Sequence, residues 1–461
     1  MDTVRLPTQY HAAFKDADIR GVYPGEINEV VVYRVGRSLP KVLQAKQVVV
    51  ARDMRCSSPQ LHRALIAGIR DSGGQVWDLG LVPTTAMYYA TGVGTTWGVM
   101  VTASHNPADY NGLKIVKPGA EPLTNASGMK EVQRFVRTYT DTDYPVVNRR
   151  GEKRTRQIIR TYVRAMERQI PLPVVKKPVR IVADAGNGMA SMMLAQVKSE
   201  SAYTIEVLNP ELDGTFPVRA SNPMLRKNQR PIKHALKTGK YDLGVSFDGD
   251  GDRVAFFLPN GQMLNGAVVG AMLAEQMLQT QPGATFIDTV FNSLIYRETI
   301  KRAGGKVKTA RVGHAFIKEQ MRKHQAIFAC EHSGHCYFQA NYFADSAILA
   351  MRYMIKAILQ AEGDVKTAVR HYLTYHQTEE ILITVPDKNA VMTAVAEKYQ
   401  ALPDAVIAKF DGVSVDQGDV WFTVKPSVTE DALKFVVESK STKRAKAVQS
   451  ELHQFLQTHA S

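Results

Sequence analysis

Hydrophobic and polar positions follow the same order in three segments of the chain, residues 47–80, 179–210 and 284–313. Each segment has a short run of β-branched residues that ends near an aspartate, then apolar residues at helical spacing, then a second short apolar run. This order predicts a β-α-β unit, in which a helix joins two parallel strands and covers one face of the sheet. Its repetition predicts three similar α/β domains.

A further apolar run follows each of these units and leads directly into a polar loop. The three runs with their loops are residues 98–107, 243–253 and 326–335. Ligands of parallel α/β sheets bind at the carboxyl ends of the strands. We therefore expect the chemistry of this protein in these three loops.

The C-terminal part of the chain departs from this order. Its short apolar runs alternate with two helical stretches and surround an Asp-Gln-Gly turn, which predicts a smaller α+β domain. The predicted fold class is α/β, with three similar mixed-sheet α/β domains followed by a smaller α+β C-terminal domain. The predicted domains are residues 1–148, 149–257, 258–366 and 367–461.

The composition is that of an ordinary globular protein. The chain of 461 residues is 44% hydrophobic and 22% charged, which excludes low-complexity and disordered classes. Cys56, Cys330 and Cys336 form no C-x-x-C pair, which fits a reducing cytosol better than a disulfide framework or a zinc ribbon. The chain shows no apolar run long enough for a signal peptide or a membrane span, so we expect a soluble cytoplasmic protein without a membrane partner.

The net charge of +14, from 58 Lys and Arg against 44 Asp and Glu, needs a physical reason. A basic surface can attract nucleic acid, anionic lipid or small anionic substrates, or it can serve solubility alone. No motif that combines aromatic and basic residues accompanies the charge, so nucleic-acid binding ranks low.

The strongest local signal is Asp248-Gly-Asp250-Gly-Asp252-Arg253, directly after a predicted strand. Carboxylates at alternate positions, with glycines between them, can fold around one hard cation. An EF-hand loop would need Gly where Arg253 stands and Glu where Pro259 stands. The pattern therefore predicts a Mg²⁺ site, beside which Arg253 could hold a phosphate oxygen.

Ser104 and His105 lie in the polar turn that ends residues 98–107. A serine at a strand end can be a nucleophile, and the neighbouring imidazole could shuttle its proton. Lys114, a little further on, could act as a general acid or base if its pKa were lowered. The chain contains no G-x-S-x-G sequence, which argues against a hydrolase triad.

The loop with Glu331, Ser333 and His335 holds a carboxylate, imidazoles and a hydroxyl within five residues. These groups could form a metal site, because imidazole and carboxylate are zinc ligands. The H-E-x-x-H spacing is missing, however, and Glu and Ser suit hydrogen bonding to vicinal sugar hydroxyls equally well. We prefer the sugar-binding interpretation.

Lys425, Ser427 and Thr429 follow a predicted strand in the C-terminal domain. With the backbone amides of such a turn they could form an anion nest suited to a phosphate. The same sequence also fits the capping box of a helix.

Taken together and in this order, the loops resemble those of the α-D-phosphohexomutase superfamily, closest to its bacterial phosphomannomutase/phosphoglucomutase branch. The resemblance covers essentially the whole chain. Its motifs are Asp18-Ile19-Arg20-Gly21, Arg52-Asp53-x-Arg55-x-Ser57-Ser58-Pro59, the Ser104 loop, Asp213-Gly-Thr-Phe-Pro217, the Asp248 loop, Val312-Gly-His314-Ala-Phe-Ile-Lys318 and the Glu331 loop.

This resemblance implies four domains around a central cleft and an intramolecular phosphotransferase. The enzyme would interconvert the 1-phosphate and 6-phosphate of mannose, glucose or both. It would act through a phosphoserine at Ser104 and a hexose 1,6-bisphosphate, which also serves as activator. Mg²⁺ would be bound by the phosphate on Ser104 together with Asp248, Asp250 and Asp252.

The resemblance also implies roles for the other catalytic residues. Arg20, Arg253 and His105 would neutralise the charge of the phosphoryl group during transfer. Lys114 would be the leading general acid or base, and His314 a second proton carrier.

The implied substrate-binding residues hold the sugar in two orientations. Glu331 and Ser333 would bind hydroxyls, and the remaining implied contacts are Arg253, His335, Lys425, Ser427 and Thr429. Phosphoglucosamine mutase is one alternative within the enzyme interpretation. A sugar-phosphate-binding relative with little turnover is another.

The phosphate loop departs from the family pattern at Lys425, Val428 and Asp431, where Arg, Asn or Gly, and Pro are usual. Lysine lacks the planar fork with which arginine binds a phosphate bidentately. We expect weaker binding of the substrate phosphate, with KM raised more than kcat is lowered.

Overall fold

The computed structural model describes residues 10, 12–198, 200–427 and 432–459. Its contacts group the chain into two compact units, Met1–Leu264 with Ser333–Val365, and Asn265–His332 with Lys366–Ser461. We call them the first and the second unit. Each joins parts of more than one predicted domain, so the boundaries after residues 148, 257 and 366 stay predictions.

The first sheet of the first unit has the strand order β1-β5-β4-β2-β3-β7, with β6 beside β5. Strand β2 pairs in parallel with β3 and β4, whereas β5 runs antiparallel to β1 and β4. Val48, Val49 and Val50 of β2 are all buried, as expected for a strand covered on both faces. The elements are β1 (Ile19–Val22), α1 (Glu29–Val42), β2 (Gln47–Arg52), α2 (Ser58–Asp71), β3 (Gln75–Leu81), α3 (Thr84–Gly94), β4 (Trp97–Val101), β5 (Tyr110–Lys117), β6 (Glu121–Pro122), α4 (Met129–Thr138) and β7 (Lys153–Thr155).

The second sheet of this unit has the order β11-β10-β8-β9, with β8 parallel to β9 and β10 and with β11 antiparallel to β10. Helix α11 contacts α5, β8 and β11. The remaining elements of the first unit, of which only β8, β9, β10 and β11 form this sheet, are α5 (Ile159–Gln169), β8 (Val179–Asp184), α6 (Ala190–Leu194), β9 (Tyr203–Leu208), η2 (Arg226–Gln229), α7 (Arg230–Leu236), β10 (Leu243–Phe247), β11 (Val254–Phe257), β15 (Cys336–Phe338), η3 (Gln339–Asn341), β16 (Ala344–Asp345) and α11 (Ala347–Gln360).

In the second unit, β12 pairs in parallel with β13 and β14. Helices α8, α9 and α10 all pack near these strands, and α8 is buried along most of its length. The elements are α8 (Gly266–Leu278), β12 (Thr285–Thr289), α9 (Leu294–Arg302), β13 (Lys306–Ala310), α10 (His314–His324) and β14 (Phe328–Cys330). Within the described residues no helix is long and apolar enough to cross a membrane.

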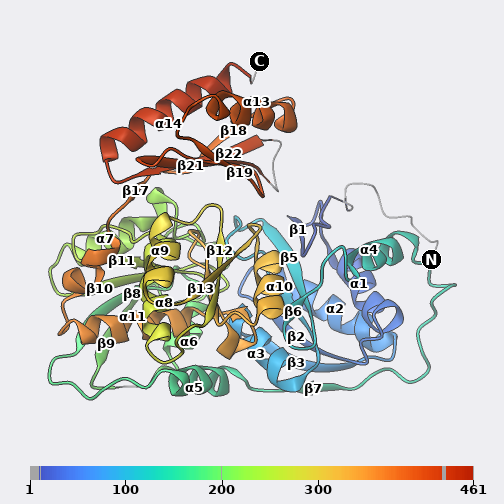
Figure 1. Cartoon of the computed structure of the whole chain (residues 1–461). Coiled ribbons are helices and arrows are strands. Elements are labelled where there is room, and N and C mark those ends of the chain that lie inside the picture. The colour runs from blue at the N-terminus through green and yellow to red at the C-terminus, as the bar shows by residue number, and fades with distance from the viewer. Residues whose placement is uncertain (1–9, 11, 199, 428–431, 460–461) are drawn as a thin grey trace. The chain divides into compact units, whose positions relative to one another are not determined.

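The C-terminal sheet of the second unit has the order β17-β22-β21-β20-β19, with β18 also paired to β22, and all its pairings are antiparallel. Helices α13 and α14 lie on one face of this sheet (Figure 1). The elements from the start of this region are α12 (Val365–Val369), η4 (Arg370–Tyr372), β17 (His376–Gln377), β18 (Ile381–Thr384), α13 (Lys388–Gln400), β19 (Val406–Lys409), β20 (Val413–Asp416), β21 (Val420–Pro426), β22 (Ala432–Ser439) and α14 (Thr442–Gln457).

The three α/β sheets share one arrangement at the strand ends that lead into the predicted functional loops. The first strands of the three repeats are β2, β8 and β12, and each has a parallel neighbour that runs into a predicted functional loop. Those neighbours are β4 before Ser104, β10 before Asp248 and β14 before Glu331. The predicted order of three α/β domains and a final α+β domain is therefore present.

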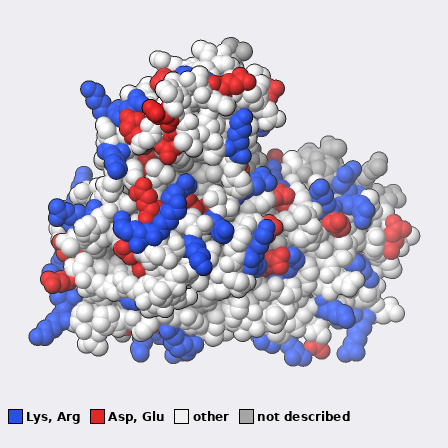
Figure 2. Space-filling model, in the orientation of Figure 1, with Lys and Arg blue, Asp and Glu red and all other residues white. Residues whose placement is uncertain are grey.

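Charged side chains do not form a single block on the face that Figure 2 shows. Lysine and arginine side chains of the described residues are interspersed there with acidic ones. On this face, the lysine and arginine side chains lie in many separate positions.

Candidate active site

The Ser104 loop holds its serine in an unusual backbone conformation. Ser104 follows β4, is buried, and has a φ of +51°, in the left-handed region. Its amide donates to Thr102 Oγ1 at 2.9 Å, and its carbonyl oxygen accepts from Arg55 Nη2 at 2.8 Å and from Ser221 Oγ at 3.0 Å. These contacts on both sides of the residue hold a conformation that a non-glycine residue rarely adopts.

The three aspartates after β10 converge. Asp248 Oδ1 accepts from the backbone amides of Gly251, Asp252 and Arg253 at 3.1, 3.2 and 3.1 Å, so the loop wraps around this carboxylate. One oxygen of Asp248, one of Asp250 and one of Asp252 lie within 4.8 Å of one another, and all three residues are buried. The sequence pattern therefore becomes one compact cluster of carboxylates.

This cluster fits a hard cation. Oδ1 of Asp250 and Oδ1 of Asp252 are buried and accept no hydrogen bond among the described residues. Burial, together with repulsion from Asp252 and Asp250, raises the pKa of Asp248 well above its usual value. Carboxylate oxygens without a hydrogen-bond donor are ligands that Mg²⁺ and Ca²⁺ bind, so these aspartates could hold a metal ion.

Lys114, on β5, lies against the same carboxylates. Its Nζ is 2.9 Å from Asp250 Oδ2 and 2.5 Å from Asp252 Oδ2. Burial lowers the pKa of Lys114, but Asp250 and Asp252 outweigh burial and hold the pKa well above its usual value. In this arrangement the pKa is thus raised rather than lowered, and the ammonium can donate a proton but cannot accept one.

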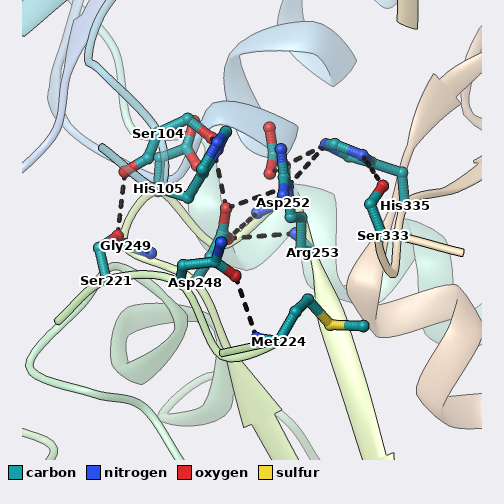
Figure 3. A network of polar contacts seen from close by, with 12 residues as sticks. Ser104, His105, Ser221, Met224, Asp248, Gly249, Asp252, Arg253, Ser333 and His335 are labelled. Atoms are coloured by element: carbon teal, nitrogen blue, oxygen red, sulfur yellow. Dashed lines mark hydrogen bonds and ion pairs between the residues drawn. The ribbon is translucent and has the colours of Figure 1, made fainter. Parts of the chain in front are cut away.

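The Ser104 hydroxyl lies between the carboxylate cluster and an imidazole (Figure 3). Ser104 Oγ is 3.3 Å from Asp248 Oδ2 and 3.4 Å from His105 Nδ1. Burial, assisted by Arg253 and Arg20, lowers the pKa of His105 well below its usual value. The imidazole is therefore neutral near pH 7 and can accept a proton.

Arg253 and His335 connect the aspartate loop to the segment after residue 332. Arg253 Nε donates to His335 Nε2 at 3.2 Å and lies 3.8 Å from Asp248 Oδ2. His335 Nε2 is 3.6 Å from Asp252 Oδ1, and its Nδ1 is 3.2 Å from Ser333 Oγ (Figure 3). The guanidinium and the imidazole therefore lie at the edge of the carboxylate cluster.

Arg20, on β1, also contacts the Ser104 loop. Its Nη1 donates to Asn106 Oδ1 at 2.8 Å, and its Nη2 pairs with Asp18 at 2.7 Å. The first unit therefore brings together Ser104 with most of the predicted catalytic and metal-binding residues and with three of the predicted substrate-binding residues. They are Arg20, His105, Lys114, Asp248, Asp250 and Asp252, and Arg253, Ser333 and His335.

The other predicted residues belong to the second unit. His314 begins α10, and Glu331 is a buried residue after β14. Lys425, near the end of β21, is buried and its Nζ donates to Asp411 Oδ2 at 2.9 Å. Ser427 is also buried, and Thr429 lies outside the described residues.

Sequence reasoning did not single out several contacts of the site. Thr84 Oγ1 donates to Asp250 Oδ2 at 2.6 Å, and Ser221 Oγ accepts from the Gly249 amide while it donates to Ser104 O. Asp411 binds Lys425 and also accepts from the Val312 amide at 2.7 Å. Thr84, Ser221 and Asp411 stand in no motif that we identified, so nothing in the sequence marked them.

Comparisons with known proteins agree with this geometry. Three family models match the chain: phosphoglucomutase/phosphomannomutase, alpha/beta/alpha domain I over residues 11–143, domain II over 160–261 and domain III over 265–375. A phosphomannomutase of Escherichia coli is 31% identical over 437 residues, 93% of this chain and 95% of that protein. A phosphomannomutase of Vibrio cholerae is 33% identical over 442 residues, 93% of this chain and 94% of that protein.

A solved structure is also similar over almost the whole chain. A phosphoglucomutase/phosphomannomutase family protein of Burkholderia thailandensis has a TM-score of 0.87 and 26% identity, with 97% of this chain and 98% of that chain covered. The fold and the site define a phosphohexomutase. The chain belongs to the phosphoglucomutase/phosphomannomutase family, and it is therefore an enzyme of phosphate transfer. The resemblance and the predicted fold class are confirmed.

Proposed function

We propose that the enzyme interconverts the 1-phosphate and 6-phosphate of mannose, glucose or both, through a phosphoserine at Ser104 and a hexose 1,6-bisphosphate. The observation that carries this proposal is the placement of the Ser104 hydroxyl, 3.3 Å from the aspartate cluster and 3.4 Å from a neutral imidazole. Phosphoryl transfer needs positioning and charge neutralisation more than any other contribution from the protein.

Asp248, Asp250 and Asp252 would hold Mg²⁺ together with the phosphate on Ser104. Two buried oxygens without a hydrogen-bond partner among the described residues, Asp250 Oδ1 and Asp252 Oδ1, support this assignment. The bound ion would supply charge neutralisation at the phosphoryl oxygens. Because the ion would bring positive charge to the same carboxylates, it would also weaken their hold on Lys114.

In the transfer step, a hydroxyl oxygen of the sugar forms a bond to phosphorus while the bond from phosphorus to Ser104 Oγ breaks. Arg20 and Arg253 would bind phosphoryl oxygens as charge builds on them. Once the ion has weakened the hold of the aspartates and the ammonium has released a proton, Lys114 would be the leading acceptor of the proton that the sugar hydroxyl loses, with His314 as a second. Ser104 Oγ would regain a proton beside His105.

The substrate would be held at two ends. Glu331, Ser333 and His335 would bind sugar hydroxyls, and the phosphate that does not react would bind Lys425, Ser427 and Thr429. The bisphosphate would then turn round and return its other phosphoryl group to Ser104. A free hexose 1,6-bisphosphate would act as activator by phosphorylating Ser104.

We place this reaction in the cytoplasm. All three cysteines, Cys56, Cys330 and Cys336, are free thiols, and two of them are buried. Free thiols are usual in a reducing compartment.

The first test is turnover of mannose 1-phosphate with Mg²⁺ and a trace of glucose 1,6-bisphosphate. Glucose 1-phosphate and glucosamine 1-phosphate are run in parallel, and Ser104→Ala serves as control. Turnover that disappears in Ser104→Ala is expected, and the ratio of the three rates assigns the substrate. Binding of all three sugars without turnover by the natural chain would contradict the proposal and would favour a sugar-phosphate-binding protein.

A further inference from the structure

The first strand of each α/β repeat ends at an aspartate that is almost completely buried. These aspartates are Asp53 after β2, Asp184 at the end of β8 and Asp288 in β12, with side chains 1% exposed or less. A buried carboxylate must be paired or hydrogen-bonded to be tolerated. The partners of the three aspartates show a shared arrangement.

In the first repeat, Asp53 faces the guanidinium of Arg55. Arg55 Nε lies 3.2 Å from Asp53 Oδ2. The two terminal nitrogens of Arg55 donate to four backbone carbonyls, those of Ser104, Asn106 and Pro107 in the Ser104 loop and that of Tyr110 at the start of β5. A single side chain therefore contacts the backbone at several points of the turn that carries the nucleophile.

The ring of Phe216 completes this arrangement. It covers the guanidinium of Arg55, with 5.2 Å between the guanidinium carbon and the ring centroid. Phe216 belongs to the Asp213-Gly-Thr-Phe-Pro217 motif, for which the proposed reaction assigns no role.

In the second repeat, Asp184 pairs with Arg219. Arg219 Nε donates to Asp184 Oδ2 at 2.5 Å, and its Nη2 donates to the carbonyl oxygen of Phe247 at 2.7 Å. Phe247 is the last residue of β10, directly before Asp248. The arginine thus holds the backbone at the start of the aspartate loop.

In the third repeat, an asparagine replaces the arginine as the group that reaches the loop. Asn292 Nδ2 donates to Asp288 Oδ1 at 3.0 Å and to the carbonyl oxygen of Cys330 at 2.9 Å. Cys330 is the last residue of β14, directly before Glu331. Arg297 pairs with the other oxygen of Asp288 at 2.9 Å.

We propose that Arg55, Arg219 and Asn292 are equivalent positioning residues, each oriented by the buried aspartate of its repeat, and that each fixes the functional loop of its own domain. The assignment of loops to phosphoryl transfer, metal binding and sugar binding rests on the proposed function. A misplacement of about 1 Å can cost on the order of 10²-fold in rate, so a device that fixes the strand end has a direct effect on catalysis.

The proposal predicts a separate defect for each substitution. Arg55→Lys keeps the positive charge beside Asp53 but loses the planar pair of terminal nitrogens that binds the backbone carbonyls. We expect it to slow transfer of ³²P from labelled glucose 1,6-bisphosphate to Ser104 by roughly 10–100-fold in a single turnover, with Mn²⁺ affinity within about twofold of the natural chain. Arg219→Lys is expected to weaken Mn²⁺ binding, measured by electron paramagnetic resonance without substrate, by about 10–100-fold.

Asn292→Ala tests the third repeat. We expect it to weaken binding of mannose 1-phosphate, measured by calorimetry on the unphosphorylated enzyme, by about tenfold. Its Mn²⁺ affinity is expected to stay within about twofold of the natural chain.

Arg352→Lys is the matched control. Arg352 is a buried arginine of the first unit that pairs with Glu200 at 3.0 Å and donates to the carbonyl oxygen of Ile170, so it resembles Arg55 without touching a functional loop. It is expected to lower the melting temperature without changing the ³²P transfer rate or Mn²⁺ affinity. If Arg55→Lys does not fold, Phe216→Leu, which leaves the guanidinium in place, is expected to give a smaller loss of the same kind.

Two results would overturn the inference: equal effects of Arg55→Lys and Arg219→Lys on both measurements, or the same pattern in Arg352→Lys. Failure of the proposed function looks different. In that case the natural chain itself takes up no ³²P, while Mn²⁺ binding by the natural chain and Arg219→Lys still tests the second repeat.

Discussion

Two buried lysines of this enzyme face aspartates, one in each compact unit. Lys114 is bound to Asp250 and Asp252 in the carboxylate cluster, and Lys425 is bound to Asp411 in the C-terminal sheet. The partners of Lys114 are candidate metal ligands, whereas Asp411 also accepts from the Val312 amide.

In the proposed reaction, each lysine must leave the ion pair that it forms with its aspartate partners. A metal ion at the cluster would neutralise much of the charge of Asp250 and Asp252 and so weaken their attraction for the Lys114 ammonium. Lys114 could then lose a proton and accept one from the sugar hydroxyl. At Lys425, the substrate phosphate has to compete with a carboxylate that the protein itself supplies. In the proposed reaction, a lysine–aspartate pair would therefore favour proton transfer at the first site and would oppose phosphate binding at the second.

The largest expected effect comes from breaking the first pair. Lys114→Ala is expected to lower kcat by about 10²–10⁴-fold, because it removes the leading proton carrier. Mn²⁺ affinity, measured by electron paramagnetic resonance, is expected to rise, since no ammonium competes for the carboxylates. Lys117→Ala, on the same strand and paired only with Glu121 among the ion pairs of the described residues, is the control and is expected to keep both values. A kcat within twofold of the natural chain would argue against the role of Lys114.

A buried carboxyl that forms no ion pair with a lysine of the described residues sharpens the comparison. Glu438, on β22, accepts from the Leu294 amide at 2.8 Å, and burial raises its pKa to about 7. Because the folded pKa lies above the unfolded value of 4.5, stability from this group is complete below about pH 4.5 and is lost as the pH rises through 7. The lost stability would be ~3 kcal/mol, at 1.36 kcal/mol for each unit of the pKa difference.

Glu438→Gln tests this directly, because glutamine keeps the acceptor and carries no charge. Relative to the natural chain, the variant is expected to gain melting temperature between pH 5 and pH 8. A difference between the two proteins that stays constant over this range would show that Glu438 does not titrate there.

Removing the charge that competes at Lys425 has a smaller expected effect. Asp411→Asn keeps an acceptor for the Val312 amide but releases the ammonium, so KM for the hexose phosphate is expected to fall several-fold with kcat within about twofold. Asp419→Asn, which removes an exposed partner of Arg444, is the control and should leave KM unchanged. An increase of KM in Asp411→Asn would mean that Asp411 orders the loop for binding.

The smallest change is expected from the lysine itself. Lys425→Arg restores the planar fork that the family usually has, and KM is expected to fall by about twofold in steady-state assays. Combined with Asp431→Pro, the variant should gain in kcat/KM. No gain in the combined variant would contradict the expectation that these departures weaken phosphate binding.

Local sequence was sufficient to predict the repeated units and the aspartate loop. The run of β-branched residues Val48, Val49 and Val50 predicts a strand that is covered on both faces, and all three residues are buried. Asp248, Asp250 and Asp252 converge because glycines lie between them. These features depend on neighbours within a few residues, so the order of the side chains is informative by itself.

The direction of the pKa shift of Lys114 was not predictable. The sequence suggested a general acid or base on the condition that the pKa of Lys114 were lowered, but Asp250 and Asp252, more than 130 residues away in the chain, raise this pKa. For the same reason Thr84 and Ser221 were missed, since they meet the site only in the folded chain.

The sequence by itself determined the family, the α/β repeats and the chemical groups of the site, because those follow from residue type and local spacing. Only the tertiary structure decided the protonation state of Lys114, the pairing of Lys425 with Asp411 and the left-handed conformation of Ser104. Electrostatic energies and hydrogen bonds depend on distances between atoms, and the fold sets those distances between residues that are far apart in the chain.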